Sequence, residues 1–156
     1  MQLYKQFVRC HLEFAVPAWS PWQTGDIDVL ERIQKTAINL ITNLQGRTYK
    51  DKLSELGLRS LRDRRIRLDL IQTFKIVHGF DRVDHSTWFK MVGDNVIRPT
   101  RNTAYPKNII GDRSNTEIRR NFFSNRVVPT WNALPTELKD SRSVGMFKSG
   151  LDKIIF

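Results

Sequence analysis

The chain has 156 residues and a mass of 18.3 kDa, which is enough for a hydrophobic core without disulfides or metals. Its 40% hydrophobic and 27% charged residues are typical of a globular protein, and no apolar run approaches the roughly 18 residues of a membrane span. The single cysteine, Cys10, excludes an internal disulfide framework and a Cys-based zinc site. Twenty-six Lys and Arg against 16 Asp and Glu give a net charge of +10, which favours a polyanionic partner.

The N-terminal segment predicts a buried helix. Apolar side chains at helical spacing cover most of the circumference of Leu3–Ala15, so we expect this helix to be buried. Pro17 and Pro21 then interrupt the pattern, and we expect a loop over residues 18–25 that carries Trp19 and Trp22.

Two more helices are expected before residue 58. Asp26 is a suitable N-cap for the clearest helix of the chain, and Gly46 ends it. A short helix over Tyr49–Leu56 follows and is closed by Gly57. The apolar stripe of the longer helix consists of Ile27, Leu30, Ile33, Ala37, Leu40, Ile41 and Leu44.

The next helix carries the densest basic cluster. Ser60 is its expected N-cap, with Asp63 three residues later, and the helix runs to about His78 before Gly79 stops it. Its predicted core face is Leu61, Leu68, Ile71, Phe74 and Val77. The arginines at 59, 62 and 65 are expected to project together on another side.

The remaining third predicts an irregular stretch and then helices. Residues 93–115 lack periodicity, and β-prone pieces at Asn95–Arg98 and Asn108–Ile110 favour a small hairpin or an ordered loop. A helix resumes over Thr116–Leu134, where Pro129 must kink or split it, and Ser143 caps a last helix. The predicted fold class is therefore mainly α, a helical bundle-like fragment with a small β-hairpin around residues 95–110.

The positive charge is concentrated in the middle of the chain. Residues 59–97 carry a net charge of +3 and residues 98–126 a net charge of +5, so +8 of the +10 lies between Arg59 and Arg126. Most of it is arginine, whose planar guanidinium suits phosphate oxygens. A solvated surface that only aids solubility is the other interpretation of this pattern.

No self-sufficient active site is found in the sequence. It has no glycine-rich phosphate loop and no Asp-Asp pair in a strand–turn context for a two-metal site. The stretch His78–His85 places two histidines and two aspartates close together without regular ligand spacing, which favours turn and helix-end roles over a metal site. Cys10 and His11 point about 100° apart on a helix, so they do not form a catalytic pair.

Aromatic residues leave a choice open between core packing and stacking on bases or sugars. Phe123 and Trp131 sit at helical spacing, which favours the core. Trp19 and Trp22, in a proline-bounded loop, are compatible with either role. The full candidate set is Trp19, Trp22, Trp88, Trp131, Phe122 and Phe123.

The order of motifs resembles one known family. The matching segments are Leu3–Ala15 (LYKQFVRCHLEFA), Pro17–Pro21 (PAWSP), Asp26–Ala37 (DIDVLERIQKTA), Leu53–Leu61 (LSELGLRSL), Arg64-Arg65, Asp69–Ile71, Arg120–Val128 (RNFFSNRVV), Trp131–Pro135 (WNALP) and Phe147–Lys153 (FKSGLDK). In this order they are similar to the region after the polymerase core of non-LTR (LINE-type) retrotransposon reverse transcriptases, most closely the jockey and similar groups. The sequence departs from the family pattern at Cys10, where Pro is usual, and at Phe14, where Tyr is usual.

The resemblance implies a thumb with a C-terminal extension. We therefore expect thumb-like helices in residues 1–57 and a basic helical C-terminal extension in residues 58–156. It also implies that the fingers, the palm and the catalytic aspartates that hold Mg²⁺ lie outside this chain, which then has no cofactor and no RNA-directed DNA polymerase activity of its own. A nuclear location follows from the family's life cycle.

The charge and the resemblance together predict the role of the arginines. A thumb holds the primer–template, whether an RNA–DNA hybrid, DNA or RNA, by its backbone without reading sequence. The arginines predicted to contact nucleic acid are Arg59, Arg62, Arg64, Arg65, Arg67, Arg98, Arg101, Arg113, Arg119, Arg120 and Arg126. The alternative is a stand-alone helical interaction module derived from a retroelement remnant, which an exposed apolar face on Leu3–Ala15 would favour.

Overall fold

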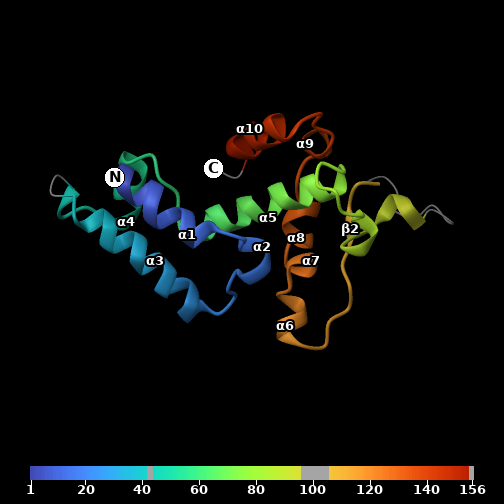
Figure 1. The fold of residues 1–156 in the computed structure, drawn as a ribbon, viewed down its shortest axis with the longest axis horizontal. Helices are drawn as coiled ribbons and strands as arrows, with labels where there is room; N and C mark the ends of the chain where they lie inside the picture. The colour runs from blue at the N-terminus through green and yellow to red at the C-terminus, as the bar shows by residue number, and fades with distance from the viewer. Residues whose placement is uncertain (42–43, 96–105, 155–156) are drawn as a thin grey trace. The chain divides into compact units, whose positions relative to one another are not determined.

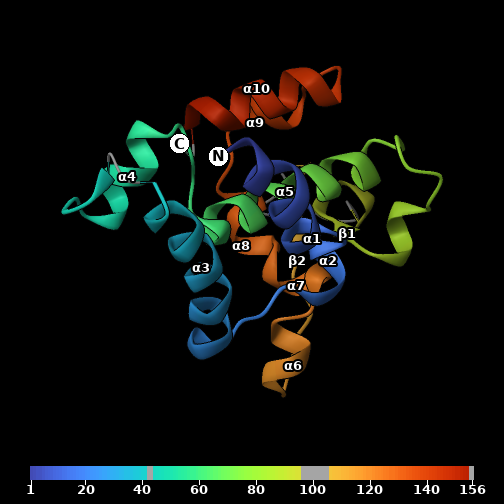
Figure 2. The same ribbon diagram turned by 60° about the vertical axis from the view of Figure 1, so that its left-hand side comes forward.

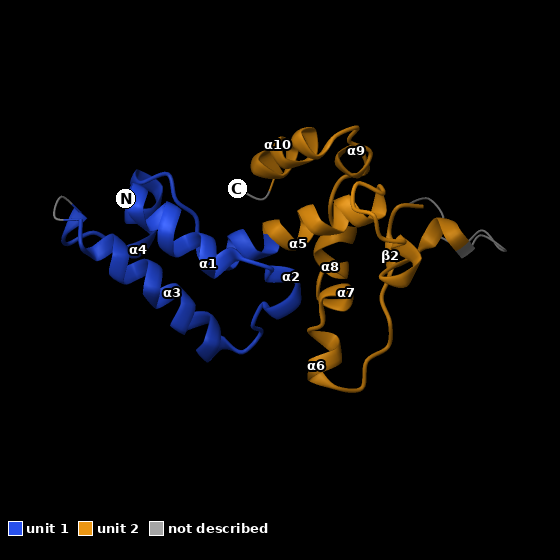
Figure 3. Ribbon diagram, in the orientation of Figure 1, with its two compact units in different colours: residues 1–66 blue, residues 67–156 orange. Residues whose placement is uncertain are grey.

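The structure, a computed structural model, describes residues 1–41, 44–95 and 106–154. It divides into two compact units, Met1–Ile66 (unit 1) and Arg67–Phe156 (unit 2), shown separately in Figure 3. The division lies within helix α5 (Leu61–Val77), nine residues after the boundary expected at 57/58. Each unit is described by itself.

The mainly α fold class is confirmed. Helices make up most of the described chain, and the strands among the described residues are β1 (Lys90–Met91) and β2 (Ile109–Ile110). They pair antiparallel, with Lys90 opposite Ile110 and Met91 opposite Ile109. The predicted piece Asn108–Ile110 supplies β2, but its partner precedes the expected Asn95–Arg98, of which residues 96–98 lie outside the described part.

The N-terminal helix is shorter than expected and is followed by another helix. It consists of η1 (Tyr4–Val8), a π-helical segment, and α1 (Arg9–Glu13). Ala15 adopts a left-handed conformation (φ 49°), which reverses the chain before α2 (Val16–Trp19). The prediction of a loop from residue 18 is therefore wrong at its start. Pro17 lies in the first turn of α2, where the missing proline N–H removes no helical hydrogen bond.

The expected burial of this N-terminal helix is also wrong. Of its apolar side chains only Tyr4 is buried, whereas Leu3, Phe7 and Phe14 expose 72%, 66% and 77% of their surface. The physical reason is geometric. Apolar residues surround the helix, but within unit 1 α3 (Thr24–Asn39) covers only the side that carries Tyr4, which bonds to Gln34.

Helix α3 buries a polar face and exposes part of the predicted apolar stripe. It begins at Thr24, so Asp26 lies in its first turn instead of capping it, and it ends at Asn39. Its buried residues are Glu31, Gln34 and Ile38. Ile33 and Leu40, which we expected in the core, are exposed.

A buried hydrogen-bond network accounts for this choice of face. The Tyr4 hydroxyl donates to Gln34 Oε1 (2.8 Å), and Gln34 Nε2 donates to the Tyr49 hydroxyl (2.9 Å). Tyr49 donates to Glu31 Oε1 (2.5 Å), whose carboxylate also accepts from the Leu61 N–H at 3.2 and 3.1 Å. Glu31 thus satisfies the first amide of α5, which would otherwise lack a partner. Burial raises the pKa of Tyr4 to about 12.

The capping predictions around α4 (Tyr49–Glu55) and α5 are confirmed. Ser60 Oγ accepts from the Asp63 N–H at 3.0 Å. Gly57 and Gly79, with φ of 57° and 67°, lie just after the two helices, where glycine adopts the left-handed conformation without strain. The apolar cluster of unit 1 contains Ile38, Leu44, Leu53 and Leu58.

Unit 2 contains several short helices where one long helix was expected. Figures 1 and 2 show α6 (Glu117–Arg120), α7 (Phe123–Arg126) and α8 (Val128–Asn132) in succession. Pro129 lies in the first turn of α8, which confirms the predicted split. Two further helices follow, α9 (Thr136–Lys139), which we did not expect, and α10 (Val144–Ile154), capped by Ser143 as predicted.

The core of unit 2 is aromatic. The rings of Phe74 and Phe147 stack with centroids 4.2 Å apart, and Trp131 is fully buried beside Phe147. The Trp131 indole N–H donates to the Lys107 carbonyl at 2.9 Å, which fastens the segment before β2 to α8. Two short 3₁₀ segments, η3 (His85–Thr87) and η4 (Val92–Asn95), flank β1.

Within residues 1–41, 44–95 and 106–154, no helix combines the length and the apolar character needed to cross a membrane.

Candidate nucleic-acid interface

Four of the predicted arginines are exposed. Arg62 lies in the first turn of α5, Arg113 lies in the segment before α6, and Arg119 and Arg120 end α6. Within the described residues, Arg62 and Arg113 form no ion pair. Arg120 pairs with Glu117 one helical turn away in a solvent-exposed contact.

Three predicted arginines of unit 1 are buried or partly buried. The guanidinium of Arg64 forms a two-pronged ion pair with the Glu13 carboxylate, with Nη2 2.7 Å from Oε2. Arg65 exposes only 4% of its surface, so the expected projection with Arg59 and Arg62 is wrong. Arg59 is half-buried, and its carbonyl accepts from Gln34.

Two arginines of unit 2 are held by carboxylates of the same unit. Arg126 contacts both oxygens of the buried Asp69 at 2.9 Å. Arg67 contacts both oxygens of Asp152 at 2.8 and 3.0 Å. Paired guanidinium and carboxylate groups of this kind are costly to separate when buried. This applies to Arg126, whose partner Asp69 is buried, whereas the Asp152 side chain is 39% exposed.

Arg98 and Arg101 lie outside the described residues.

Exposed cations gather around Asp112, between β2 and α6. Lys90 Nζ lies 2.8 Å from Asp112 Oδ1, and Arg119 Nη2 lies 3.5 Å from Asp112 Oδ2. The hydrogen bond from Lys90 is the main reason why the pKa of Asp112 lies below its ordinary value. One carboxylate here faces two cations, and Arg113 follows it in the chain, so the local charge is positive.

Two exposed aromatic rings lie beside these cations. Trp88 follows η3 and Phe122 precedes α7, and their ring centroids are 6.4 Å apart with planes inclined by 4°. The guanidinium carbon of Arg119 lies 5.5 Å from the centre of the Phe122 ring. We call the set Trp88, Lys90, Arg119 and Phe122 the basic–aromatic surface. Its mixture of cations and ring faces is suited to contacts with nucleic acid.

The His78–His85 stretch is not gathered into a ligand cluster. His78 Nδ1 lies 3.1 Å from the Phe74 carbonyl and Nε2 lies 3.4 Å from Lys107 Nζ, so both ring nitrogens have protein neighbours. His85 lies near Asp84 and Asp94 instead. In the described part of the chain, no three His, Cys, Asp or Glu side chains are placed to hold a metal.

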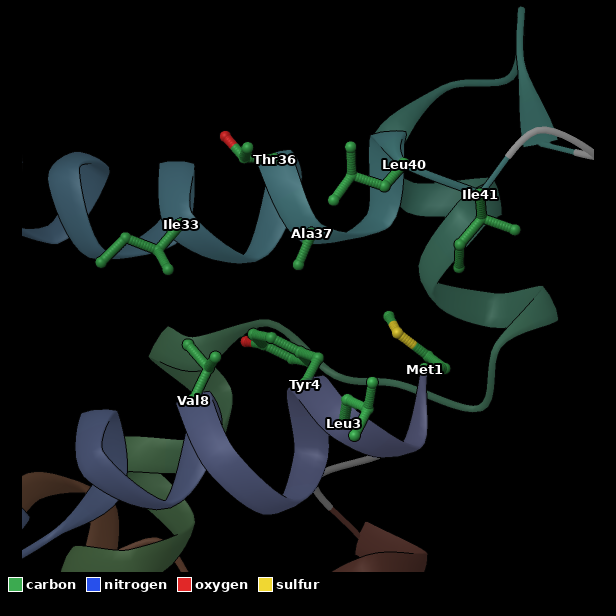
Figure 4. Close-up of a pocket in the computed structure, with 9 residues that line it drawn as sticks. All are labelled: Met1, Leu3, Tyr4, Val8, Ile33, Thr36, Ala37, Leu40 and Ile41. Atoms are coloured by element: carbon green, nitrogen blue, oxygen red, sulfur yellow. The ribbon is translucent and has the colours of Figure 1, made fainter.

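Unit 1 has an apolar groove between its N-terminal helix and α3 (Figure 4). Its volume is about 620 Å³, and Leu40, at its edge, exposes 79% of its surface. The lining residues are Met1, Leu3, Tyr4, Val8, Ile33, Thr36, Ala37, Leu40 and Ile41. Such a groove accommodates apolar side chains and offers no charge to a nucleic acid.

Comparisons of the chain with protein-family models, with characterised proteins and with solved structures gave no match.

Only part of the basic–aromatic surface could be predicted from the sequence. Arg119 was among the predicted residues, and Trp88 and Phe122 were candidates for either stacking or core packing, but Lys90 was missed. The available signal was the repeated neighbourhood of aromatic and basic residues, at residues 88–90 and again at 119–123. Their contact across more than thirty residues depends on the β1–β2 pairing, which is not visible in either segment alone.

Proposed function

We propose that the chain binds nucleic acid through the phosphate backbone, as the thumb and C-terminal extension of a non-LTR retrotransposon reverse transcriptase. It contributes binding and not catalysis, because polymerisation requires the fingers, the palm and the Mg²⁺-binding aspartates of the parent enzyme. The observation that carries the proposal is the pair of exposed cations, Lys90 and Arg119, on the single carboxylate of Asp112, with the exposed Arg113 next to it in the chain.

The exposed ion pairs support a phosphate-binding role. Arg119–Asp112 and Arg120–Glu117 are solvent-exposed pairs, and such pairs contribute at most about 1 kcal/mol. A phosphate oxygen can replace the carboxylate at little cost, and arginine binds phosphate with two parallel hydrogen bonds. Arg126 is less available, because exchange would leave the buried Asp69 carboxylate unpaired.

The proposal extends to partners and location. The partners are an RNA–DNA hybrid, DNA or RNA, together with the palm and fingers of the polymerase, and the site of action is the nucleus. Because backbone contacts carry no base information, we expect similar affinity for different sequences.

A second candidate function is a helical protein-interaction module. The observation in its favour is the exposed apolar surface of unit 1, where Leu3, Phe7 and Phe14 are exposed and Leu3 also lines the groove. An apolar groove between two helices suits the apolar face of a third helix. In this function unit 1 binds another protein, and the charge of unit 2 serves solubility.

The test of the first function is fluorescence anisotropy with a labelled primer–template duplex. The variant carries Arg113→Gln, Arg119→Gln and Arg120→Gln. Its matched control carries Arg32→Gln, Arg47→Gln and Lys50→Gln, three exposed cations of unit 1. Both variants lose three positive charges, so a difference between their affinities reports the position of the cations and not the net charge.

We expect the first variant to bind at least tenfold more weakly, because the loss of even one charge-assisted hydrogen bond of about 1.5 kcal/mol weakens binding about tenfold. The control should lose less than about threefold, which is the share due to net charge alone. Equal losses in the two variants would contradict a role for this surface. Affinity that depends on duplex sequence would contradict backbone recognition.

A further inference from the structure

Trp88 and Phe122 present an unusual pair of partly exposed rings. They expose 38% and 43% of their surfaces, and their planes are parallel to within 4°. Two exposed rings with a common orientation offer parallel faces to a third flat group. Among the described residues, no acceptor receives a hydrogen bond from the Trp88 indole N–H.

Buried rings hold this pair in place from beneath. Phe123 contacts the Trp88 ring edge-on at 6.1 Å and the Phe89 ring edge-on at 5.7 Å. Phe89 and Phe123 are almost completely buried. Arg126, held by Asp69, lies 5.7 Å from the centre of the Phe123 ring. The Trp88 ring therefore rests on a fixed support and the Phe122 ring stacks on Trp88, so a ligand that stacks on Trp88 causes little loss of conformational entropy in the protein.

The charge beside the rings selects the kind of flat group. Arg119 lies over the Phe122 ring, and Lys90 is bonded to the same Asp112 carboxylate that Arg119 approaches. A neutral aromatic peptide brings no negative charge to pair with these cations. A nucleotide brings a flat base for the rings and a phosphate for the cations.

We propose that Trp88 and Phe122 form a stacking site for an unpaired base of single-stranded nucleic acid, with Arg119 and Lys90 on the adjacent phosphate. The site takes single strands because a base inside a duplex already has both faces covered by its neighbours. The inference rests on the proposed function for its polyanionic partner, and it adds a single-stranded segment to the duplex proposed there.

The experiment separates base stacking from phosphate binding with two labelled probes. One is oligothymidylate of about 15 nucleotides, and the other is the same sugar–phosphate backbone without bases. Anisotropy gives the affinity of the full chain for each probe. The variants are Trp88→Ala, Trp88→Phe and Phe122→Leu, with Trp22→Ala as the control, because Trp22 is an exposed tryptophan (43%) of unit 1. Thermal unfolding of each variant shows that it is folded.

We expect the wild-type chain to prefer the probe with bases on the order of tenfold, as one stacked base provides. Trp88→Ala and Phe122→Leu should remove most of this preference and leave the affinity for the abasic probe unchanged. Trp88→Phe should retain much of it, and Trp22→Ala all of it. Because Phe122 is more exposed than Trp88, Phe122→Leu tests the site even where Trp88→Ala does not fold.

Three other results would each contradict the stacking site. Equal wild-type affinity for the two probes overturns the stacking site and leaves backbone binding in place. A preference that Trp88→Ala and Phe122→Leu both retain also overturns it. Absence of binding to either probe overturns the stacking site, whereas the proposed function is judged separately by the affinity for the primer–template duplex.

Discussion

Glu31 shows at the residue scale why a charged side chain can occupy a core position. Its carboxylate accepts from the Tyr49 hydroxyl and from the first amide of α5, so the charge is compensated by fixed donors. Tyr49 in turn has a raised pKa, because it is buried and donates to this carboxylate. Glu31 thereby fixes where α5 begins relative to α3 within unit 1.

Replacement of Glu31 therefore tests the network. Glu31→Ala leaves a buried hydroxyl and a helix-terminal amide without an acceptor, and we expect a loss of about 2 kcal/mol in the free energy of unfolding. Asp28→Ala, an exposed carboxylate on the same helix, is the matched control and should change it by less than about 0.5 kcal/mol. Urea unfolding measures both. Equal effects would show that the carboxylate has no structural role.

His78 gives unit 2 a predicted sensitivity to acid. Burial is the main reason why its pKa lies below 6.5, and Lys107, which itself pairs with Asp140, lowers it further. The unfolded chain therefore binds a proton near pH 6.5 while the folded unit does not. Stability is complete above this value and falls as the pH drops towards the folded pKa.

We expect the urea concentration at the unfolding midpoint of the wild-type chain to decrease as the pH is lowered from about 7.5 to about 5.5. The unfolding midpoint of His78→Phe should decrease less, because this variant keeps a ring against Phe74 and removes the titrating group. His11→Gln changes an exposed position of unit 1, and its midpoint should decrease as much as that of the wild type. The same decline in all three proteins would rule out His78 as its source.

At the element scale, the N-terminal helix and α3 share an uncovered apolar surface. Leu3 and Leu40 lie on opposite walls of the groove, and both are largely exposed. Apolar surface of this kind favours association, because contact removes it from water. In the isolated chain, a second copy is the available partner.

We expect the wild-type chain to self-associate reversibly at high micromolar concentration, as measured by sedimentation velocity. Leu3→Glu with Leu40→Glu should be monomeric, because a charge in the groove opposes burial. Ile118→Glu, which replaces an equally exposed apolar residue of unit 2, should associate like the wild type. A monomeric wild-type chain would show that the groove does not bind a second copy of the chain.

The elements predicted best were those defined by local signals. Ser60 and Ser143 cap helices as expected, and Gly57 and Gly79 end them, because each signal acts within one helical turn. The buried face of α3 was predicted wrongly, because apolar periodicity assumes that a core is apolar. Here donors from Tyr4, Tyr49 and Leu61 make Glu31 and Gln34 favourable, and these donors lie far away in the sequence.

The candidate site was predicted only in part for a related reason. Sequence shows where arginines are, but not which of them meet a carboxylate. Arg64 and Glu13 are 51 residues apart, and Arg126 and Asp69 are 57 residues apart. The fold decides that these arginines are paired and that Arg119 stays exposed.

At the scale of the whole molecule, net charge overstates the capacity to bind phosphate. The chain has a charge of +10, yet Arg64, Arg67 and Arg126 are held by carboxylates and Arg65 is buried. The groups best placed for phosphate among the described residues are Arg62, Lys90, Arg113, Arg119 and Arg120. A few phosphates, and not ten, are therefore expected to be neutralised.

The salt dependence of duplex binding tests this account most directly. Anisotropy titrations at several salt concentrations give the slope of log K against log salt, which is about −0.9 for each phosphate neutralised. We expect a slope of about −2.7 to −4.5, for three to five phosphates, with little dependence on sequence. A slope near zero, or no binding at low salt, would show that the charge of this chain does not serve nucleic-acid binding.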